Sequence, residues 1–227
     1  MPLKIDLHVH TRYSSDSSIT PKDLVIQARM KGLNGIAVTD HDTIEGAMKI
    51  VRMIESPRGD NRLGNLIAIP GIEVSTRQGH LLGLNVTMSI PRGLDVEEAI
   101  ERIHDAGGVA VAAHPWILFK RGIGLDSKIL SYGLDAIEVM NSSAFPFWLS
   151  ARKCREFARR HNLPQTAGSD SHIPETIGLA YTIISECETK IESLMESIRK
   201  GLTKPAGRGM PLSLRVKRAL DALRGVS

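Results

Sequence analysis

The feature that most constrains the fold is an alternation of short apolar runs with longer segments of helical periodicity. Strands are predicted by the apolar stretches LKIDLHV, NGIAVTD, LIAIPGIEVS, HLLGLNV, VAVAAH, LDAIEVM, PQTAGSD and AYTIIS. Helices are predicted over residues 21–32, 43–56, 95–108, 147–162 and 190–201, the first with Thr20 as N-cap and Pro21 in its first turn. Short apolar strands between helices indicate a parallel sheet buried on both faces. Roughly seven such units favour a closed or nearly closed (β/α) barrel over an open sheet.

The length and composition agree with one globular domain followed by a short tail. The chain has 227 residues, of which 42% are hydrophobic and 24% charged, and a barrel of this kind fits that length. We predict a barrel domain over residues 1–202, then a linker and a basic C-terminal helix over residues 203–227 that packs on the barrel. The linker is predicted over residues 203–212, because Pro and Gly break the periodicity of TKPAGRGMPL.

The expected location is the cytoplasm. No apolar run approaches the roughly 20 residues that a membrane span needs, and we expect neither a leader peptide nor contact with a membrane. Cys154 and Cys187 lack paired spacing, so we expect both thiols to be reduced.

Positive charge is concentrated at the C-terminal end. The net charge is +4, yet the segment from Arg199 onward holds eight basic residues and one acidic residue, Asp221. Such a tail can bind anionic ligands or nucleic acid, or it can be a solvated basic helix. The sequence leaves both readings open, together with the oligomeric state.

Polar residues gather where the predicted strands end. In a (β/α) barrel the carboxyl ends of the strands meet on one face, and active sites lie there. The residues at or beside these ends are Asp6, His8, His10, Asp40, His41, Asp42, Glu73, His80, His114, Asn141, Asp170 and His172. His104 lies within a predicted helix and His161 near a helix end, so both are interpreted as structural.

His8 and His10 are the sharpest signal in this group. Side chains alternate along a strand, so both imidazoles lie on one face and can bind one ion. Imidazole and carboxylate are ligands of zinc, manganese and iron.

The order of five motifs resembles the PHP (polymerase and histidinol phosphatase) domain family. These are DLHVHT (6–11), TDHD (39–42), GIEVS (71–75), AHP (113–115) and GSDSH (168–172). The resemblance runs from about residue 4 to residue 185. It implies a distorted (β/α)7, TIM-like barrel with a trinuclear metal site, and phosphoester hydrolysis in free-standing members.

The resemblance also implies which residues hold two or three divalent ions of zinc, manganese or iron. The implied ligands are His8, His10, Glu73 and Asp170 for the first ion, Glu73 as a bridge with His80 and His114 for the second, and Asp16, His41 and His172 for the third. Asp16 stands where some members have His. Catalytic roles are expected for Glu73, Asp170 and His172.

Residues around the implied ligands have expected supporting roles. Asp6 and Asp40 can accept the free N–H of a ligating imidazole, or can cap the strand ends. Arg121, Asn141 and Ser169 are the favoured contacts for a substrate phosphate, against the alternative of surface charge or loop hydrogen bonds. Further phosphate candidates are Arg12, Lys120 and Arg208.

The expected function is that of an enzyme, a metal-dependent phosphoric ester hydrolase. It would hydrolyse a small phosphorylated metabolite or nucleotide through a metal-activated hydroxide at a centre of several metal ions. The resemblance implies that this centre is trinuclear. One alternative is an exonuclease or oligonucleotide phosphodiesterase on the same metals, with aromatic residues near the strand ends to stack on bases. Those residues are Trp116, Phe119, Phe145, Phe147 and Trp148. A second alternative is a non-catalytic module that metals stabilise.

Overall fold

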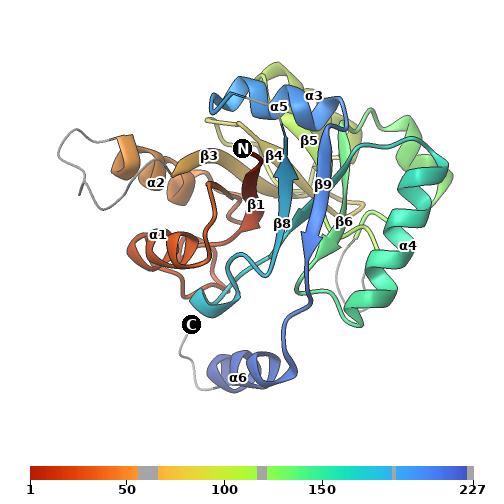
Figure 1. Ribbon diagram of the computed structural model, residues 1–227. Helices are drawn as coiled ribbons and strands as arrows, with labels where there is room; N and C mark the ends of the chain where they lie inside the picture. The colour runs from red at the N-terminus through yellow and green to blue at the C-terminus, as the bar shows by residue number, and fades with distance from the viewer. Residues whose placement is uncertain (56–65, 117–121, 186–187, 224–227) are drawn as a thin grey trace.

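The computed structural model describes residues 1–55, 66–116, 122–185 and 188–223 of the chain. In this part, a nine-stranded sheet rolls into a nearly closed barrel with helices packed around it (Figure 1). The strands are β1 (Leu3–Val9), β2 (Gly35–Val38), β3 (Ile67–Ser75), β4 (His80–Leu84), β5 (Val109–Ala112), β6 (Ala136–Asn141), β7 (Gln165–Gly168), β8 (Ala180–Ile184) and β9 (Thr203–Gly207). The helices are α1 (Pro21–Met30), α2 (Glu45–Glu55), α3 (Val96–Asp105), α4 (Phe147–Arg160), α5 (Ile191–Arg199) and α6 (Leu212–Leu223).

The predicted distorted α/β barrel with a C-terminal helix is confirmed. The strand order is β7-β6-β5-β4-β3-β2-β1-β8-β9. The backbone closes the barrel where β7 ends beside β1: Asp170 N–H donates to the His8 carbonyl at 2.7 Å, and His10 N–H donates to the Ser171 carbonyl at 3.0 Å. The sheet is not parallel throughout, because β4 runs antiparallel to β3 and β5, and β8 runs antiparallel to β1 and β9. These reversals are the distortion.

The core inside the barrel is apolar and is closed at one end by α5. Leu3, Ile5 and Leu7 of β1 belong to this inner cluster, together with Leu194 and Ile198 of α5. In Figure 1, α5 lies near the start of β1, and α6 lies at the opposite end of the barrel. The end toward which β1 runs is therefore free for polar residues.

Two register shifts change which face the side chains occupy. Along β1, the pairing with β2 gains one residue between Asp6 and Val9. Leu7 and His8 are consecutive, yet Leu7 packs in the inner core while His8 contacts groups of the opposite barrel wall. An extra residue of this kind is a β-bulge, which re-aims the side chains that follow it. The pairing of β6 with β7 gains a residue in the same way between Glu138 and Met140.

The sequence-based helix boundaries hold to within a few residues, and the cap of α1 is as predicted. The Thr20 hydroxyl accepts the backbone N–H of Asp23 at 3.1 Å, and Pro21 opens the helix. This cap satisfies one of the N–H groups that a helix start leaves without an intrahelical partner.

The prediction of a linker over residues 203–212 is wrong for its first part. Thr203–Gly207 form strand β9, which pairs antiparallel with β8 and lies at one edge of the sheet. Pro205 has no N–H to donate, and an edge strand tolerates this because one of its sides needs no ladder partner. Residues 208–211 then connect β9 to α6. Placing a domain boundary near residue 203 stays a prediction.

Among the described residues, no helix has both the length and the apolar character needed to cross a bilayer. Cys154 is a buried free thiol on α4, and burial raises its pKa to about 11. Cys187 lies outside the described residues.

Candidate metal centre

All nine residues expected as metal ligands lie at one end of the barrel. Their donor atoms form four overlapping groups, and within each group these atoms lie within 4.8 Å of one another. The groups are His8, Glu73 and His114; His8, His10 and Asp170; His41, Glu73 and His80; and His10, Asp16, His41 and His172.

Glu73 is the hub of this cluster. Its Oε1 lies 3.0 Å from His80 Nδ1 and 3.0 Å from His114 Nε2. Its Oε2 lies 3.1 Å from His10 Nε2 and 3.2 Å from His8 Nε2. Burial disfavours the charged carboxylate, but the imidazoles of His8, His10 and His114 outweigh burial and hold the pKa of Glu73 well below its ordinary value. Glu73 is thus an anion that faces several imidazoles at once.

His8 and His10 aim their Nε2 atoms at one point, as the His-x-His pattern predicted. These two atoms are 3.1 Å apart, and Asp170 Oδ1 lies 3.4 Å from the Nε2 of His10. Burial lowers the pKa of His10, but the carboxylates of Asp170 and Glu73 outweigh it and raise that pKa to about 9. A proton held between imidazole and carboxylates occupies a place that a divalent ion can take, because metal binding releases such protons.

His80 reaches the centre because β4 is antiparallel to its neighbours. It is the first residue of β4 and pairs with Ser75, the last residue of β3. The start of β4 therefore lies at the same end of the barrel as the carboxyl end of β3.

Asp16, His41 and His172 form the side of the cluster that solvent reaches. Asp16 Oδ2 lies 2.8 Å from His172 Nε2 and 4.0 Å from His41 Nε2. The side chain of Asp16 is 46% exposed and that of His41 is 27% exposed, whereas Glu73 is 1% exposed. The cluster is therefore most open to solvent on the Asp16 side. Burial and the nearby His10 lower the pKa of His172 to about 4, so its imidazole is neutral.

The donor set fits divalent metal ions. The Nδ1 atoms of His41 and His114 are buried and hydrogen-bond no partner in the described part of the chain. Buried polar atoms in folded proteins normally have a partner. The Nδ1 of His41 lies 3.3 Å from Glu73 Oε2, so these two atoms fit a divalent cation as shared ligands. Neutral imidazoles and carboxylates suit zinc, manganese and iron alike.

Glu138 orients the imidazole of His8, and the sequence analysis missed it. Its Oε1 lies 3.1 Å from His8 Nδ1, and its Oε2 accepts the backbone N–H of His114 at 2.8 Å and Asn141 Nδ2 at 2.9 Å. A carboxylate behind a ligating imidazole fixes the tautomer and ring orientation. The available signal was the single acidic residue inside the apolar run AIEVM, since a buried acid is rarely without a partner.

The expected contacts of Asp6 and Asp40 with an imidazole are not found among the described residues. Asp6 precedes the bulge of β1, so its carboxylate lies on the other face from His8. It accepts the backbone N–H groups of Ser169 and Gly178, each at 2.8 Å. Burial raises the pKa of Asp6 to about 6, against these hydrogen bonds. This matches the alternative interpretation of a strand-end cap.

Asp40 is linked to the cluster by hydrogen bonds through the Ser14 hydroxyl. Its carboxylate accepts the Thr11 backbone N–H at 2.5 Å and the Ser14 hydroxyl at 3.2 Å. The Ser14 Oγ in turn lies 3.2 Å from His10 Nδ1 and accepts the His41 backbone N–H at 2.8 Å. Ser14 is a second supporting residue that the sequence did not single out.

Two of the residues expected to contact phosphate, Asn141 and Ser169, hydrogen-bond other protein groups. Asn141 Nδ2 donates to Glu138 and lies 3.3 Å from Asp170 Oδ2. The Ser169 hydroxyl is buried at 2.5 Å from Ser171 Oγ. Arg121, with Lys120 and Phe119, falls outside the described residues. Substrate contact by Arg121, Asn141 and Ser169 stays a prediction.

The two histidines interpreted as structural lie away from the centre. His104 Nε2 pairs with Asp135 Oδ2 at 2.8 Å, and the His161 ring lies 4.6 Å from the ring of Phe157.

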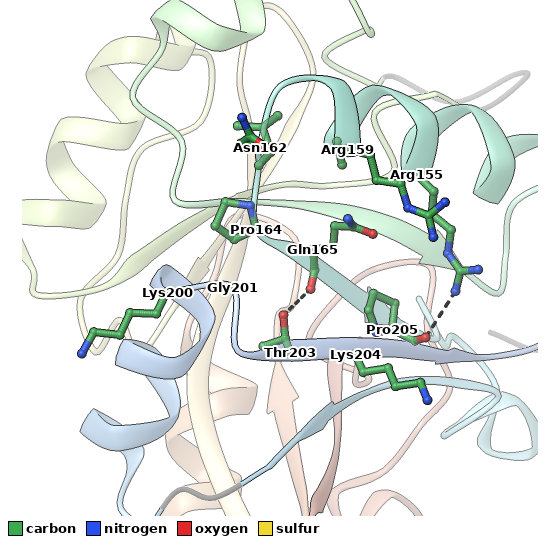
Figure 2. Close-up of a pocket in the computed structure, with 12 residues that line it drawn as sticks. Arg155, Arg159, Asn162, Pro164, Gln165, Lys200, Gly201, Thr203, Lys204 and Pro205 are labelled. Carbon is green, nitrogen blue, oxygen red and sulfur yellow. Dashed lines mark hydrogen bonds between the residues drawn. The ribbon is translucent and has the colours of Figure 1, made fainter.

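A separate basic hollow lies between α4, the end of α5 and β9 (Figure 2). Its volume is about 560 Å³, and its lining includes Arg155, Arg159, Lys200 and Lys204 with no acidic residue. Arg155 donates to the Pro205 carbonyl at 3.3 Å, which Figure 2 marks with a dashed line. Gln165, the first residue of β7, lines this hollow, whereas the last residue of β7 lies beside His8. The hollow is thus distinct from the metal centre.

Comparison with known proteins gives the family. A family model described as PHP-associated matches residues 149–203. An uncharacterized protein of Methanocaldococcus jannaschii, MJ1587, is 35% identical over 150 residues, which cover 62% of this chain and 82% of the relative. A 5′-3′ exoribonuclease of Haemophilus influenzae is 35% identical over 96 residues, and the match spans 40% of this chain and only 32% of the relative.

Two solved structures share the fold. One is a two-domain protein of Bacteroides vulgatus that contains a predicted PHP-like metal-dependent phosphoesterase, with a TM-score of 0.66, 20% identity, and coverage of 92% of this chain and 65% of that chain. The other is the lesion-specific endonuclease PfuEndoQ of Pyrococcus furiosus, with a TM-score of 0.65, 20% identity, and coverage of 91% and 59%. With the motif order, the metal-binding groups and the barrel, these matches lead to one conclusion: the chain belongs to the PHP domain family.

Proposed function

We propose that the protein is a metal-dependent phosphoesterase that hydrolyses the phosphate ester of a small metabolite or nucleotide at a trinuclear centre. The observation that carries the proposal is the sharing of Glu73 among overlapping groups of imidazole and carboxylate donors. His8, His10, Glu73 and Asp170 would hold the first ion. Glu73, His80 and His114 would hold the second, and Asp16, His41 and His172 the third.

Divalent ions bound here would acidify water and neutralise phosphate oxygens, which is the chemistry that phosphoester hydrolysis requires. The chain's own residues prepare the place. Glu73 keeps its negative charge, because the surrounding imidazoles lower its pKa. Glu138 holds His8 with its Nε2 toward the centre. The left-handed backbone at His114 (φ 29°) and Asp170 (φ 53°) is the kind of strain that folds retain at functional sites.

The names of the relatives support ester hydrolysis at phosphorus. One is an exoribonuclease, and the fold neighbours include an endonuclease and a PHP-like phosphoesterase. A centre of several cations favours substrates with two or more negative charges over neutral amides. A terminal phosphate monoester is therefore the favoured substrate class.

The test combines metal analysis with ester hydrolysis. Purified protein with added Mn²⁺, Zn²⁺ or Fe²⁺ is assayed on p-nitrophenyl phosphate, nucleoside monophosphates and bisphosphates. His10→Ala is expected to lower bound metal and to reduce turnover at least about 100-fold, because it removes a donor at the junction of two groups. The matched control is His104→Ala, since His104 pairs with Asp135 away from the centre.

Two results would count against the proposal. Full activity and full metal content in the His10→Ala protein would remove the metal assignment. No turnover of any of these esters by metal-loaded wild-type protein would remove the activity.

An exonuclease or oligonucleotide phosphodiesterase is the second candidate. It is favoured by the exoribonuclease relative and by the basic hollow of Figure 2, where Arg155, Arg159 and Lys204 offer positive charge to a nucleic-acid backbone. A 5′-phosphorylated labelled oligonucleotide distinguishes the two candidates. Processive shortening of this oligonucleotide would favour the nuclease if the double variant Arg159→Ala/Lys204→Ala shortens it more slowly. Turnover of mononucleotides by the double variant should then be unchanged.

A further inference from the structure

Arg215 of helix α6 makes several hydrogen bonds to the rim of the barrel. The guanidinium of Arg215 donates to the carbonyls of Ser143 at 3.0 Å, Ala144 at 2.8 Å and Ser142 at 3.2 Å. Its Nε donates to the Met210 carbonyl at 3.2 Å. The first three carbonyls follow directly after Asn141, the last residue of β6. The helix therefore has a defined place against the barrel.

The orientation of α6 is the reverse of what burial of apolar surface would produce. Leu212, Val216 and Leu220 recur every four residues along one stripe, and they are 70%, 52% and 45% exposed. A surface helix normally turns such a stripe to the core and its charged residues to solvent. Here Arg215 and Arg218 are turned toward the barrel instead. Polar contacts of Arg215 and Arg218 therefore hold this helix against the barrel with its apolar stripe exposed.

Arg218 is the residue that this orientation brings to the metal centre. It follows Arg215 by three positions, so both lie on the same side of the helix. Its Nη2 lies 3.9 Å from Asp16 Oδ2, and the same Oδ2 lies 2.8 Å from His172 Nε2. Asp16 is also the most exposed of Asp16, His41 and His172, so Arg218 lies on the side of the metal centre that solvent reaches.

We infer that Arg218 binds the phosphate of the substrate and positions it over the metal centre, which makes α6 a part of the active site. The inference rests on the proposed function and deepens it. A guanidinium presents paired N–H donors that match the oxygens of a phosphate group. Its pairing with Asp16 is long and half-exposed, so exchanging it for phosphate oxygens costs little.

Lys217 provides the internal comparison. It lies next to Arg218 on the same helix, yet it pairs with Glu175. A general attraction between a basic helix and an anion would involve both cations, whereas a site built around Arg218 involves only one.

The experiment measures binding of inorganic phosphate to metal-loaded, full-length protein by calorimetry. Arg218→Ala is expected to weaken phosphate binding about 10- to 100-fold, the loss of one charge-assisted contact. Arg218→Lys is expected to recover part of the affinity, and Lys217→Ala to stay within about twofold of wild type. Metal content is expected to be equal in all four proteins. In ester hydrolysis, Arg218→Ala is expected to raise KM more than it lowers kcat.

Phosphate affinity unchanged in Arg218→Ala would overturn the inference, and so would equal losses in Arg218→Ala and Lys217→Ala. No measurable phosphate binding by the wild-type protein would overturn it as well. The proposed function is judged separately by ester turnover. If Arg218→Ala hydrolyses esters as fast as wild type, only the role of Arg218 is removed. If Arg218→Ala weakens phosphate binding but the wild-type protein hydrolyses no ester, the phosphoesterase proposal is removed and the anion site remains.

Discussion

Replacing Glu138 by Gln tests whether the carboxylate behind His8 controls metal binding. Glu138 uses both oxygens: Oε1 faces His8 Nδ1 at 3.1 Å, and Oε2 accepts His114 N–H and Asn141 Nδ2 at 2.8 and 2.9 Å. A glutamine has one oxygen and one NH2 group, so one of these two sides must then face a donor.

Either orientation of the glutamine is costly. If its oxygen serves His114 and Asn141, its NH2 faces His8 Nδ1, and His8 must carry its proton on Nε2, where a metal would bind. If the oxygen serves His8, the NH2 faces two N–H donors. One lost hydrogen bond to a charged group is worth about 1.5–3 kcal/mol, which is roughly 10- to 150-fold in affinity. Loss of such a supporting group typically lowers metal affinity about 10- to 100-fold.

The assay is competition with a metal chelator, read together with metal content after dialysis. We expect the Glu138→Gln protein to bind its most weakly held metal ions at least about tenfold less tightly than wild type. We expect its rate of ester hydrolysis to fall in parallel. The matched control is Glu156→Gln, because Glu156 is an exposed carboxylate that pairs with Arg152 on α4. Wild-type metal affinity in the Glu138→Gln protein would refute the reasoning, because it would show that His8 needs no carboxylate to hold its tautomer.

Three further predictions follow from packing and burial. Gly168→Ala places a Cβ 2.3 Å from the Cβ of His8, so we expect a destabilisation of about 1–3 kcal/mol, visible as a lower melting temperature, and a lower metal content; an unchanged melting curve would contradict this. Burial raises the pKa of the Cys154 thiol to about 11, so this thiol should react with a thiol reagent at pH 8 only after unfolding. The reaction is measured in a Cys187→Ser protein, and fast reaction in the native state would contradict the burial of Cys154. Arg215→Ala removes the hydrogen bonds that fasten α6, so trypsin should cleave this helix faster and phosphate binding should weaken with metal content unchanged; slow cleavage equal to wild type would show that other contacts hold the helix.

The sequence was most informative where function depends on a local pattern. Side-chain alternation placed His8 and His10 on one face, and the cap at Thr20 marked the start of α1, because both depend on neighbouring residues only. The order of motifs at strand ends gathered the remaining candidate ligands except Asp16, because a barrel brings its strand ends together whatever the loops between them do. Asp16 lies in the loop after β1, and only the family resemblance implied it.

It was least informative where the answer depends on contacts between distant segments. Strand β9 was read as a linker because Pro205 and the nearby glycines break periodicity, and only pairing with β8 makes the segment a strand. The roles of Arg215 and Arg218 depend on where the rim of the barrel lies relative to α6, which no periodicity encodes. The basic tail was expected to bind an anion or to be solvated, and its exposed apolar stripe shows that composition alone did not determine which face turns inward.

The bulges in β1 and β6 account for both the success and the failure at the metal centre. Below the bulge of β1, Leu3, Ile5 and Leu7 fill the barrel with apolar groups, and in a regular strand the even-numbered histidines would then face the outer helices. One extra residue after Asp6 reverses the alternation, so His8 and His10 turn inward while Asp6 stays on the outer face. The same shift in β6 lets Glu138 and Asn141, three residues apart, share the inner face. A single strand can therefore contribute first to the apolar core and then to the polar cluster of candidate metal ligands. For the same reason a strict two-residue period correctly paired the histidines, while the hydrogen bonds of Asp6 to Ser169 and Gly178 and the contact of Glu138 with His8 depend on the bulges, which no period in the sequence predicts.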